Sequence, residues 1–472
     1  MKILLIRPFI IPAEGVSPPL SLLYLSAYLK KYNSQIDVKI VDECIDKARL
    51  KEVSLDVSAI RKLVQDIKNY HPDMIGMTLF SNEIKEIAKL CALIKNEIKD
   101  CRIVLGGPHP TAMPQETLEL ISHCDFVVRG EGEIILHDLV NSLASGKNAD
   151  HVKGISYRKG KMICHNEDAA IITNLDDIPF PDRESLLHNY RNGTYSSFLS
   201  GSPVDILITS RGCPFQCSYC FKVCHRYRSR SAKNVLKEID WVFKNIVPEY
   251  IYIMDDSFTA QRERCKEILD GLIERKYKCK FRVRSRVDAI GKELLDKMKK
   301  AGVETIVYGL ESGSQAMLNA FNKRTTVKQN ITACQLTRQA GINCFADMIL
   351  FYPGETKATL QETEEFIRIS KANLMQFHIL TPLPRTKVYE EAKKNGTLIG
   401  DWDALGQTPW IKTKEFDNLK VMEAISRRLL LKTLASPSRL FWLMRSFGIS
   451  FLRNPVFFLQ KVVYNFIIKR KY

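Results

Sequence analysis

The first 145 residues alternate short apolar runs with segments of helical length, and this alternation limits the folds open to the chain. Continuous apolar runs are typical of strands that are buried on both faces of a parallel sheet. The runs lie at Ile3–Ile6, Val38–Val41, Met74–Thr78, Ile103–Leu105 and Phe126–Val128, and the helical patterns at Leu20–Lys31, Ile60–Asn69, Glu83–Ile98 and Ile134–Leu143. The pattern predicts an α/β fold with a doubly wound, Rossmann-like sheet, whose ligand crevice lies at the carboxyl ends of the strands.

A second alternation runs from residue 201 to residue 390. Strands are predicted at Asp205–Thr209, Tyr250–Met254, Lys280–Val283, Thr305–Tyr308, Cys344–Leu350 and Met375–Leu380. Strand–helix units in this order predict a partial (β/α)6 barrel, with its site again at the carboxyl ends of the strands. Between the two domains, residues 146–200 are predicted to form a linker that contains a hairpin at Lys153–His165. Residues 391–472 are predicted to form a C-terminal helical region.

Three of the 13 cysteines lie in one short loop directly after the first strand of the predicted barrel. They are Cys213, Cys217 and Cys220, with the spacing C-x3-C-x2-C. Three thiolates this close suit three corners of an iron–sulfur cube. The fourth iron is then free to bind a small molecule, and an open coordination position is typical of a catalytic metal site. The sequence therefore predicts that these cysteines are catalytic metal ligands.

Other interpretations of the same loop have to be weighed. Structural zinc uses four ligands, usually in two well-separated pairs, whereas this chain has a single run. Cys224 extends the run, so a closed electron-transfer cluster with four cysteine ligands is an alternative, although its first gap differs from the bacterial ferredoxin spacing. Three thiols without any ligand role are the remaining alternative.

The cysteine loop, with the aromatic Tyr219 before its last cysteine, resembles the signature of the radical S-adenosylmethionine superfamily. The resemblance implies that S-adenosylmethionine chelates the open iron of a [4Fe–4S] cluster. One electron, from a donor such as a flavodoxin or a ferredoxin, then splits the bound S-adenosylmethionine and gives a 5′-deoxyadenosyl radical. The protein's task is to hold and orient the cofactor.

Polar residues at the later strand ends resemble the cofactor-binding segments of the same superfamily. They are Asp255 and Asp256 after the second strand, Arg284 and Arg286 after the third, and Glu311 and Ser312 after the fourth. The resemblance implies that a guanidinium pairs with the methionyl carboxylate and that Glu311 accepts hydrogen bonds from ribose hydroxyls. Each segment alone also fits a turn or a solvated salt bridge, but the ordered series supports the cysteine loop.

The N-terminal domain, residues 1–145, resembles the cobalamin-binding domain that precedes many radical S-adenosylmethionine enzymes. The matching residues include Pro18, Pro19, Thr78, Gly106, Gly107, His109, Gly130 and Glu131. The chain has no D-x-H-x-x-G motif to supply an imidazole to cobalt, so cobalamin is expected to bind without a histidine ligand. His109 is then a residue at the cofactor edge or a partner of the backbone. A domain that binds no cofactor is the alternative.

Together the resemblances imply a cobalamin-dependent radical methyltransferase that acts on an unactivated carbon. The same layout also serves radical cyclisation and rearrangement, and fold similarity does not choose between them. A non-catalytic iron–sulfur or zinc binding protein is an alternative from another class. The series of Asp255, Arg286 and Glu311 argues against it, because a binding module has no use for a cofactor cradle.

The net charge of +17 is concentrated near the end of the chain, where no Asp or Glu follows Glu423. Aromatic, basic, acid-free segments such as residues 437–472 suit the surface of an anionic membrane and would favour a lipid-like substrate. Packing of this tail on the barrel is the alternative. Nucleic-acid binding is disfavoured because no recognition motif accompanies the charge. Without an export signal or a long apolar span, the protein is predicted to be cytoplasmic, with peripheral contact at the inner face of the membrane as an extension of that prediction.

Overall fold

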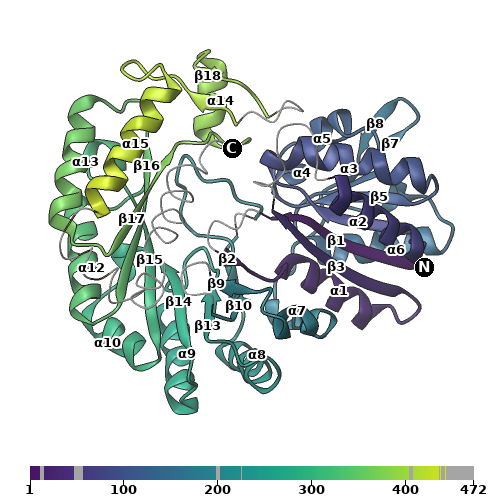
Figure 1. Ribbon diagram of the computed structural model, residues 1–472, viewed down its shortest axis with the longest axis horizontal. Coiled ribbons are helices and arrows are strands. Elements are labelled where there is room, and N and C mark those ends of the chain that lie inside the picture. Colours follow the sequence, from purple (N-terminus) through teal and green to yellow (C-terminus); the bar gives the residue numbers. More distant parts are fainter. Residues whose placement is uncertain are drawn as a thin grey trace. The chain divides into compact units, whose positions relative to one another are not determined.

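The computed structural model describes residues 1–10, 15–46, 57–197, 202–224, 226–402, 408–434, 436, 439 and 442 (Figure 1). The chain divides into two compact units. One comprises Met1–Tyr195 with Trp402–Gln407, and the other comprises Ser196–Asp401 with Thr408–Tyr472. Each unit is built around its own parallel sheet, as the two alternations in the sequence predict.

The first unit contains a seven-stranded sheet in the order β3-β1-β4-β5-β6-β7-β8. Its strands are β1 (Lys2–Ile10), β3 (Asp37–Asp46), β4 (Met74–Thr78), β5 (Arg102–Gly106), β6 (Phe126–Val128), β7 (Ile155–Lys159) and β8 (Met162–His165). The first five are parallel, and the hairpin of β7 and β8 adds two antiparallel strands at the edge. The apolar run in β1 is buried throughout, which confirms the predicted doubly wound sheet.

The short helix α7 (Leu187–Arg191) lies in the predicted linker, and six further α-helices lie in the described part of the first unit. They are α1 (Leu20–Tyr32), α2 (Val57–Tyr70), α3 (Ile84–Glu97), α4 (Pro108–Ala112), α5 (Pro114–Leu120) and α6 (Gly132–Ala144). The sequence predicts the four longer helices, whereas α4 and α5 are not foreseen. Each of these two helices is too short to show helical periodicity. Each begins with a proline, which is favoured at the first position of a helix and interrupts any helical pattern before it.

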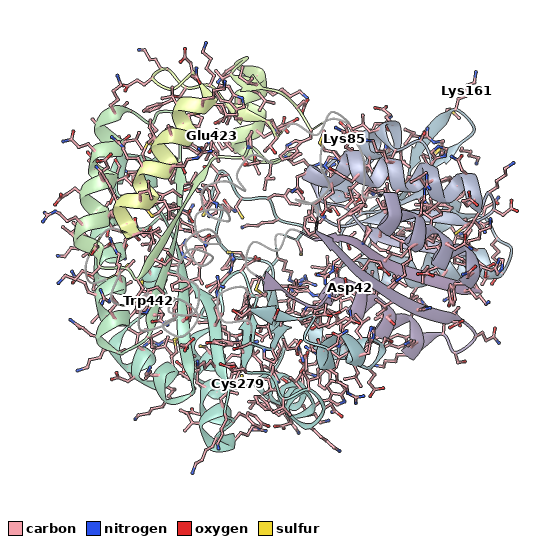
Figure 2. All side chains as sticks on the ribbon, in the orientation of Figure 1. Asp42, Lys85, Lys161, Cys279, Glu423 and Trp442 are labelled. Carbon is pink, nitrogen blue, oxygen red and sulfur yellow. The ribbon has the colours of Figure 1, made fainter. Side chains whose placement is uncertain are left out.

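Much of the predicted linker is bound to the first unit. Asp182 accepts hydrogen bonds from the Ser26 hydroxyl and the Lys30 amine of α1, both at 2.6 Å. The Tyr195 hydroxyl donates to Asp42 at 2.7 Å, and Asp42, labelled in Figure 2, also forms an ion pair with Arg7 of β1. Residues up to Tyr195 therefore fold with the first unit, because polar contacts between distant segments fix a stretch that shows no strand or helix periodicity.

The second unit contains a six-stranded parallel sheet in sequence order, which confirms the partial barrel. Its strands are β10 (Val204–Leu207), β13 (Tyr250–Ile253), β14 (Lys280–Ser285), β15 (Val303–Glu311), β16 (Asn343–Leu350) and β17 (Leu374–Ile379). Side chains alternate between buried and half-buried along β14 and β16. In β14, for example, Phe281 and Val283 join the core beneath the helices, while Arg282 and Arg284 point to the opposite, open face.

Helices follow these strands in the order expected for a barrel (Figure 1). They are α8 (Ala232–Asn245), α9 (Arg262–Arg275), α10 (Lys292–Lys300), α11 (Gln315–Ala320), α12 (Val327–Gln339), α13 (Lys357–Ser370), α14 (Lys387–Lys394) and α15 (Leu419–Leu434). None of the helices in the described ranges has both the length and the apolar character that a membrane span requires.

Two described residues of the basic tail contact the second unit. The Arg439 guanidinium is buried and donates to the backbone carbonyls of Ala372 at 2.7 Å and Ile367 at 2.6 Å. The Trp442 indole N–H, labelled in Figure 2, donates to Asn343 at 2.8 Å. The predicted membrane-binding residues after Trp442 lie outside the described part of the chain.

Candidate functional site

The cysteine loop is closed at its base by a short antiparallel pair, β11 (Ser210–Arg211) and β12 (Arg228–Ser229). Gly212 lies at the start of the loop with a φ of +77°, and a Cβ atom there would lie 2.5 Å from the Arg226 carbonyl oxygen. Only glycine accepts this backbone without strain. The sequence Arg-Gly-Cys therefore turns the chain sharply just before the first cysteine.

Cys213, Cys217 and Cys220 are unpaired, and each is at least partly exposed. Among the residues that the structure describes, no three His, Cys, Asp or Glu side chains are arranged to hold a single metal ion. An iron–sulfur cube does not need that arrangement, because each thiolate binds a different iron. The donor set, three accessible thiols in one loop, fits such a cluster. Cys224, the fourth thiol of the run, is also unpaired and partly exposed.

Asp255, at the carboxyl end of β13, fixes the segment that leads into the loop. Its side chain is 1% exposed. One carboxylate oxygen accepts the backbone N–H groups of Thr209 and Ser210, at 2.6 and 3.0 Å, and the other accepts their two hydroxyls, at 2.5 and 2.7 Å. Its neighbour Asp256 is exposed at the same strand end. The Asp255 carboxylate therefore holds the chain in place, whereas the Asp256 carboxylate is accessible to a ligand.

Glu311, at the end of β15, is held in a left-handed backbone conformation with a φ of +65°. Its oxygen Oε1 accepts hydrogen bonds from the Tyr219 hydroxyl and the Lys323 amine, both at 2.8 Å. Burial alone lowers the pKa of Lys323, but the Glu311 carboxylate raises it above its ordinary value overall. The buried amine is therefore charged, and it joins the strand end to the aromatic residue of the cysteine loop. The next predicted residue, Ser312, is buried and accepts the Ser314 N–H at 3.0 Å.

The segment after α11 is hydrogen-bonded to the cysteine loop on several sides. The Ser218 N–H donates to the Phe321 carbonyl at 3.0 Å, and the Asn322 side chain donates to the Gln216 carbonyl at 2.7 Å. The Tyr352 hydroxyl, from the segment after β16, donates to the Ser218 hydroxyl at 2.8 Å. These contacts place the loop against the carboxyl ends of β15 and β16, and the sequence expects Glu311 and Ser312 to bind the cofactor at the first of these two ends.

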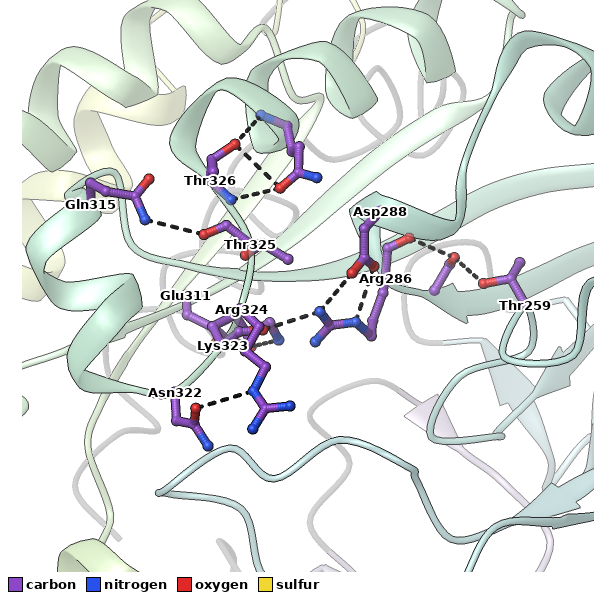
Figure 3. A network of polar contacts seen from close by, with 12 residues as sticks. Thr259, Arg286, Asp288, Glu311, Gln315, Asn322, Lys323, Arg324, Thr325 and Thr326 are labelled. Carbon is purple, nitrogen blue, oxygen red and sulfur yellow. Dashed lines mark hydrogen bonds and ion pairs between the residues drawn. The ribbon is translucent and has the colours of Figure 1, made fainter.

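Arg284 and Arg286 differ in their surroundings at the end of β14. Arg284 is half-buried on the open face of the sheet. Arg286 is buried, forms an ion pair with Asp288 at 2.8 Å, and stacks on the Phe215 ring with 3.6 Å between the guanidinium carbon and the ring centroid (Figure 3 shows the ion pair). The sequence does not indicate the roles of Lys323 and Phe215, because Phe215 and Arg286 lie far apart in the chain and no motif links Lys323 to Glu311. Asp288 lies only two residues after Arg286, but no motif at this spacing singles it out.

A further polar pair lies on the open face of the sheet. Asp347 of β16 and His378 of β17 lie 3.7 Å apart. Burial raises the pKa of Asp347, but the nearby His378 side chain and the charge of Arg284 lower it overall. The Asp347 carboxylate is therefore ionised, and it lies close to the strand ends. No motif in the sequence indicates this pair.

In the first unit, the residues that match the cobalamin-binding pattern gather along the carboxyl edge of the sheet. The Leu79 N–H donates to the Gly106 carbonyl at 2.8 Å, and the Gly130 N–H donates to the Thr111 hydroxyl at 3.0 Å. The Ser21 hydroxyl of α1, just after Pro18 and Pro19, lies 3.5 Å from that of Thr78. A Cβ at Gly130, where φ is +88°, would have no atom within 4 Å, so this edge has open space for a ligand close to the backbone.

His109 is buried beside this edge. Its Nδ1 lies 2.9 Å from the Ser81 hydroxyl, and among the described residues its Nε2 has no hydrogen-bond partner. Burial lowers the pKa of His109 to about 4, so the imidazole is neutral near pH 7. Glu131 is the N-cap residue of α6, and Gly107 has a φ of +106° that favours glycine. The open space at Gly130 and the unpartnered Nε2 of His109, among the described residues, fit a cofactor bound at this edge.

Comparison with known proteins identifies both units. The model of the radical SAM superfamily matches residues 207–367, and that of the B12 binding domain matches residues 6–140. An uncharacterized methyltransferase of Pyrococcus horikoshii is 28% identical over 484 aligned positions, which cover 100% of this chain and 97% of the relative. The anaerobic magnesium-protoporphyrin IX monomethyl ester cyclase of Cereibacter sphaeroides is 30% identical over 388 positions, covering 80% of this chain and 61% of the relative.

Among solved structures, the radical S-adenosylmethionine methyltransferase TsrM from Kitasatospora setae superposes with a TM-score of 0.72. The match covers 93% of this chain and 89% of TsrM at 15% sequence identity, and it shows a shared fold. The two matched family models together define the class of proteins that carry a B12 binding domain and a radical SAM domain in one chain. Within that class, the chain belongs to the radical S-adenosylmethionine enzymes that carry a cobalamin-binding domain.

Proposed function

We propose that this enzyme is a cobalamin-dependent methyltransferase that places a methyl group on an unactivated carbon of a small-molecule substrate. The observation that carries the proposal is the presence, in one chain, of three unpaired thiols in the cysteine loop and of open space at Gly130 in the first unit. The relative from Pyrococcus horikoshii, which aligns over 97% of its length, is named as a methyltransferase and supports the same reaction class.

In this proposal Cys213, Cys217 and Cys220 hold a [4Fe–4S] cluster, and S-adenosylmethionine binds beside Asp256 and Arg284. The edge around Gly107 and Gly130 holds cobalamin, with the neutral His109 beside it. When bound, the cluster and S-adenosylmethionine supply a radical that removes a substrate hydrogen atom, and cobalamin supplies the methyl group. A one-electron donor, such as a flavodoxin or a ferredoxin, completes the system.

The residues of the chain serve this chemistry by holding the loop and shaping the strand ends. Asp255 fixes the segment before Cys213, while Glu311 and Lys323 fix Tyr219 between the second and third cysteines. A buried, fully bonded scaffold of this kind keeps the reacting groups in a single geometry. A lipid-like substrate is a narrower form of the proposal, and it depends on tail residues that lie outside the described part of the chain.

Radical cyclisation is the second candidate function, because the relative from Cereibacter sphaeroides is named as a cyclase and matches 80% of this chain. The two functions differ in the fate of the methyl group. The enzyme is reconstituted anaerobically with iron and sulfide, with or without hydroxocobalamin, is reduced by a one-electron donor, and is supplied with S-adenosylmethionine that carries a trideuterated methyl group. Cobalamin-dependent S-adenosylhomocysteine supports methyl transfer. Turnover to 5′-deoxyadenosine without S-adenosylhomocysteine supports cyclisation and contradicts the proposal.

A further inference from the structure

Protein groups accept hydrogen bonds from two of the three nitrogens of the Arg286 guanidinium. Its Nε and Nη2 atoms donate to the two carboxylate oxygens of Asp288, at 3.1 and 2.8 Å, and Nη2 also donates to the Lys323 carbonyl at 3.1 Å (Figure 3). A guanidinium has five N–H groups, and these bonds use three of them. The bidentate ion pair fixes the plane of the group, because both oxygens of one carboxylate bind two of its nitrogens.

One face of this fixed plane covers the Phe215 ring, with 3.6 Å between the guanidinium carbon and the ring centroid. Phe215 lies in the gap between Cys213 and Cys217, so its position sets the path of the chain between the first two thiols. The next residue, Gln216, is held at its carbonyl by Asn322 at 2.7 Å. A cation stacked on an aromatic face is attractive, and it is strongest where water is excluded.

We propose that Arg286 is a positioning residue of the cysteine loop, which holds Phe215 and thereby the spacing of Cys213 and Cys217. This rests on the proposed function only in taking the loop as the cluster site. Asp288 orients the guanidinium, and the Lys323 carbonyl couples it to the Glu311–Tyr219 contact on the other side of the loop. The loop is thus held at both of its aromatic residues, one in each gap between the cysteines.

The contact between Arg286 and Phe215 lies within the protein chain and involves no cofactor. It is therefore tested on the full-length metal-free protein by hydrogen exchange of the peptide that spans residues 212–222. Arg286→Lys keeps the charge and removes the planar stacked group. We expect exchange in this peptide to be about two- to thirtyfold faster, the range that corresponds to loss of one cation–aromatic contact. Phe215→Leu should accelerate exchange similarly, and the double variant should be no faster than either single variant.

Two further variants serve as controls. Phe215→Tyr keeps the aromatic face and should restore the slow exchange that Phe215→Leu loses. Arg282→Lys makes the same substitution on the same strand, where the guanidinium lies 5.2 Å from the Tyr252 ring centroid and 5.8 Å from that of Phe345. It should leave exchange in the 212–222 peptide unchanged. Equal acceleration by Arg282→Lys would show a general loosening of the sheet and overturn the inference.

A second readout separates positioning from direct cofactor binding. The variants are reconstituted anaerobically, and the affinity for S-adenosylmethionine is measured per bound cluster. We expect Arg286→Lys to lower the iron and sulfide retained while leaving this affinity unchanged. Wild-type exchange together with a weakened affinity would make Arg286 a cofactor ligand and overturn the inference. Neither result bears on methyl transfer, because exchange in the metal-free loop is independent of the reaction catalysed.

Discussion

Lys323 and Glu311 form a buried ion pair, with 2.8 Å between Nζ and Oε1, and the Tyr219 hydroxyl donates to the same oxygen. Both side chains are at most 10% exposed. Removing one partner of such a pair leaves a buried charge without compensation. The pair therefore makes the packing of Tyr219, and of the cysteines on either side of it, depend on a lysine that is distant in the sequence.

The first prediction follows from this pair. Lys323→Met should lower the free energy of unfolding of the second unit by about 3–5 kcal/mol, the usual cost of breaking a buried ion pair. The double variant Lys323→Met, Glu311→Gln should recover much of the loss, because no buried charge is then left alone. Urea titration of the four proteins of this double-mutant cycle measures the coupling. Additive effects of the two substitutions would contradict the pairing.

Asp255 provides a second prediction. Asp255→Ala should destabilise the segment that enters the cysteine loop by about 2–4 kcal/mol, because two buried backbone N–H groups and two hydroxyls lose their acceptor. The exposed neighbour offers a matched control, and Asp256→Ala should change the free energy of unfolding by less than about 0.5 kcal/mol. Chemical denaturation of the metal-free proteins checks both values. Equal losses for the two variants would show that the Asp255 contacts do not govern this segment.

Glu355 predicts a pH dependence in the second unit. Its side chain is 2% exposed, and burial raises its pKa from 4.5 to about 7. The folded protein therefore keeps a proton that the unfolded chain releases between pH 4.5 and 7, so stability falls as the pH rises through this window, by about 3 kcal/mol in all. Glu355→Gln should remove the decline and should be more stable than the wild type above pH 7. Melting curves from pH 4.5 to 8 test this, and a decline that persists in Glu355→Gln would refute it.

For His109 we expect the opposite pH dependence of stability, in the first unit. Burial lowers its pKa from 6.5 to about 4, so the unfolded chain takes up a proton that the folded protein refuses. The contribution of the neutral His109 to the free energy of unfolding is fully present above pH 6.5. This contribution, about 3 kcal/mol, is lost as the pH falls to 4. In His109→Gln the acid-induced loss of protection of the β5 amides should shrink, as measured by hydrogen exchange from pH 4 to 7. An unchanged loss would place the acid-sensitive group elsewhere.

The features that the sequence predicts well are those encoded in neighbouring residues. Met74–Thr78 and Phe126–Val128 are observed as strands with the predicted bounds, because a buried parallel strand needs a continuous apolar run. The cysteine loop can also be identified from spacing alone. The contacts of Phe215 with Arg286 and of Tyr219 with Glu311 join segments that are far apart in the sequence. No local pattern encodes them, and only the folded barrel brings these side chains together.

The most direct test of the account is the formation of 5′-deoxyadenosine by the reconstituted, reduced enzyme supplied with S-adenosylmethionine under anaerobic conditions. The account predicts that the wild-type protein binds iron and sulfide and produces 5′-deoxyadenosine, and that Cys213→Ala produces none. A protein that binds zinc without sulfide, or a Cys213→Ala variant that makes as much 5′-deoxyadenosine as the wild type, would contradict the assignment of the cysteine loop.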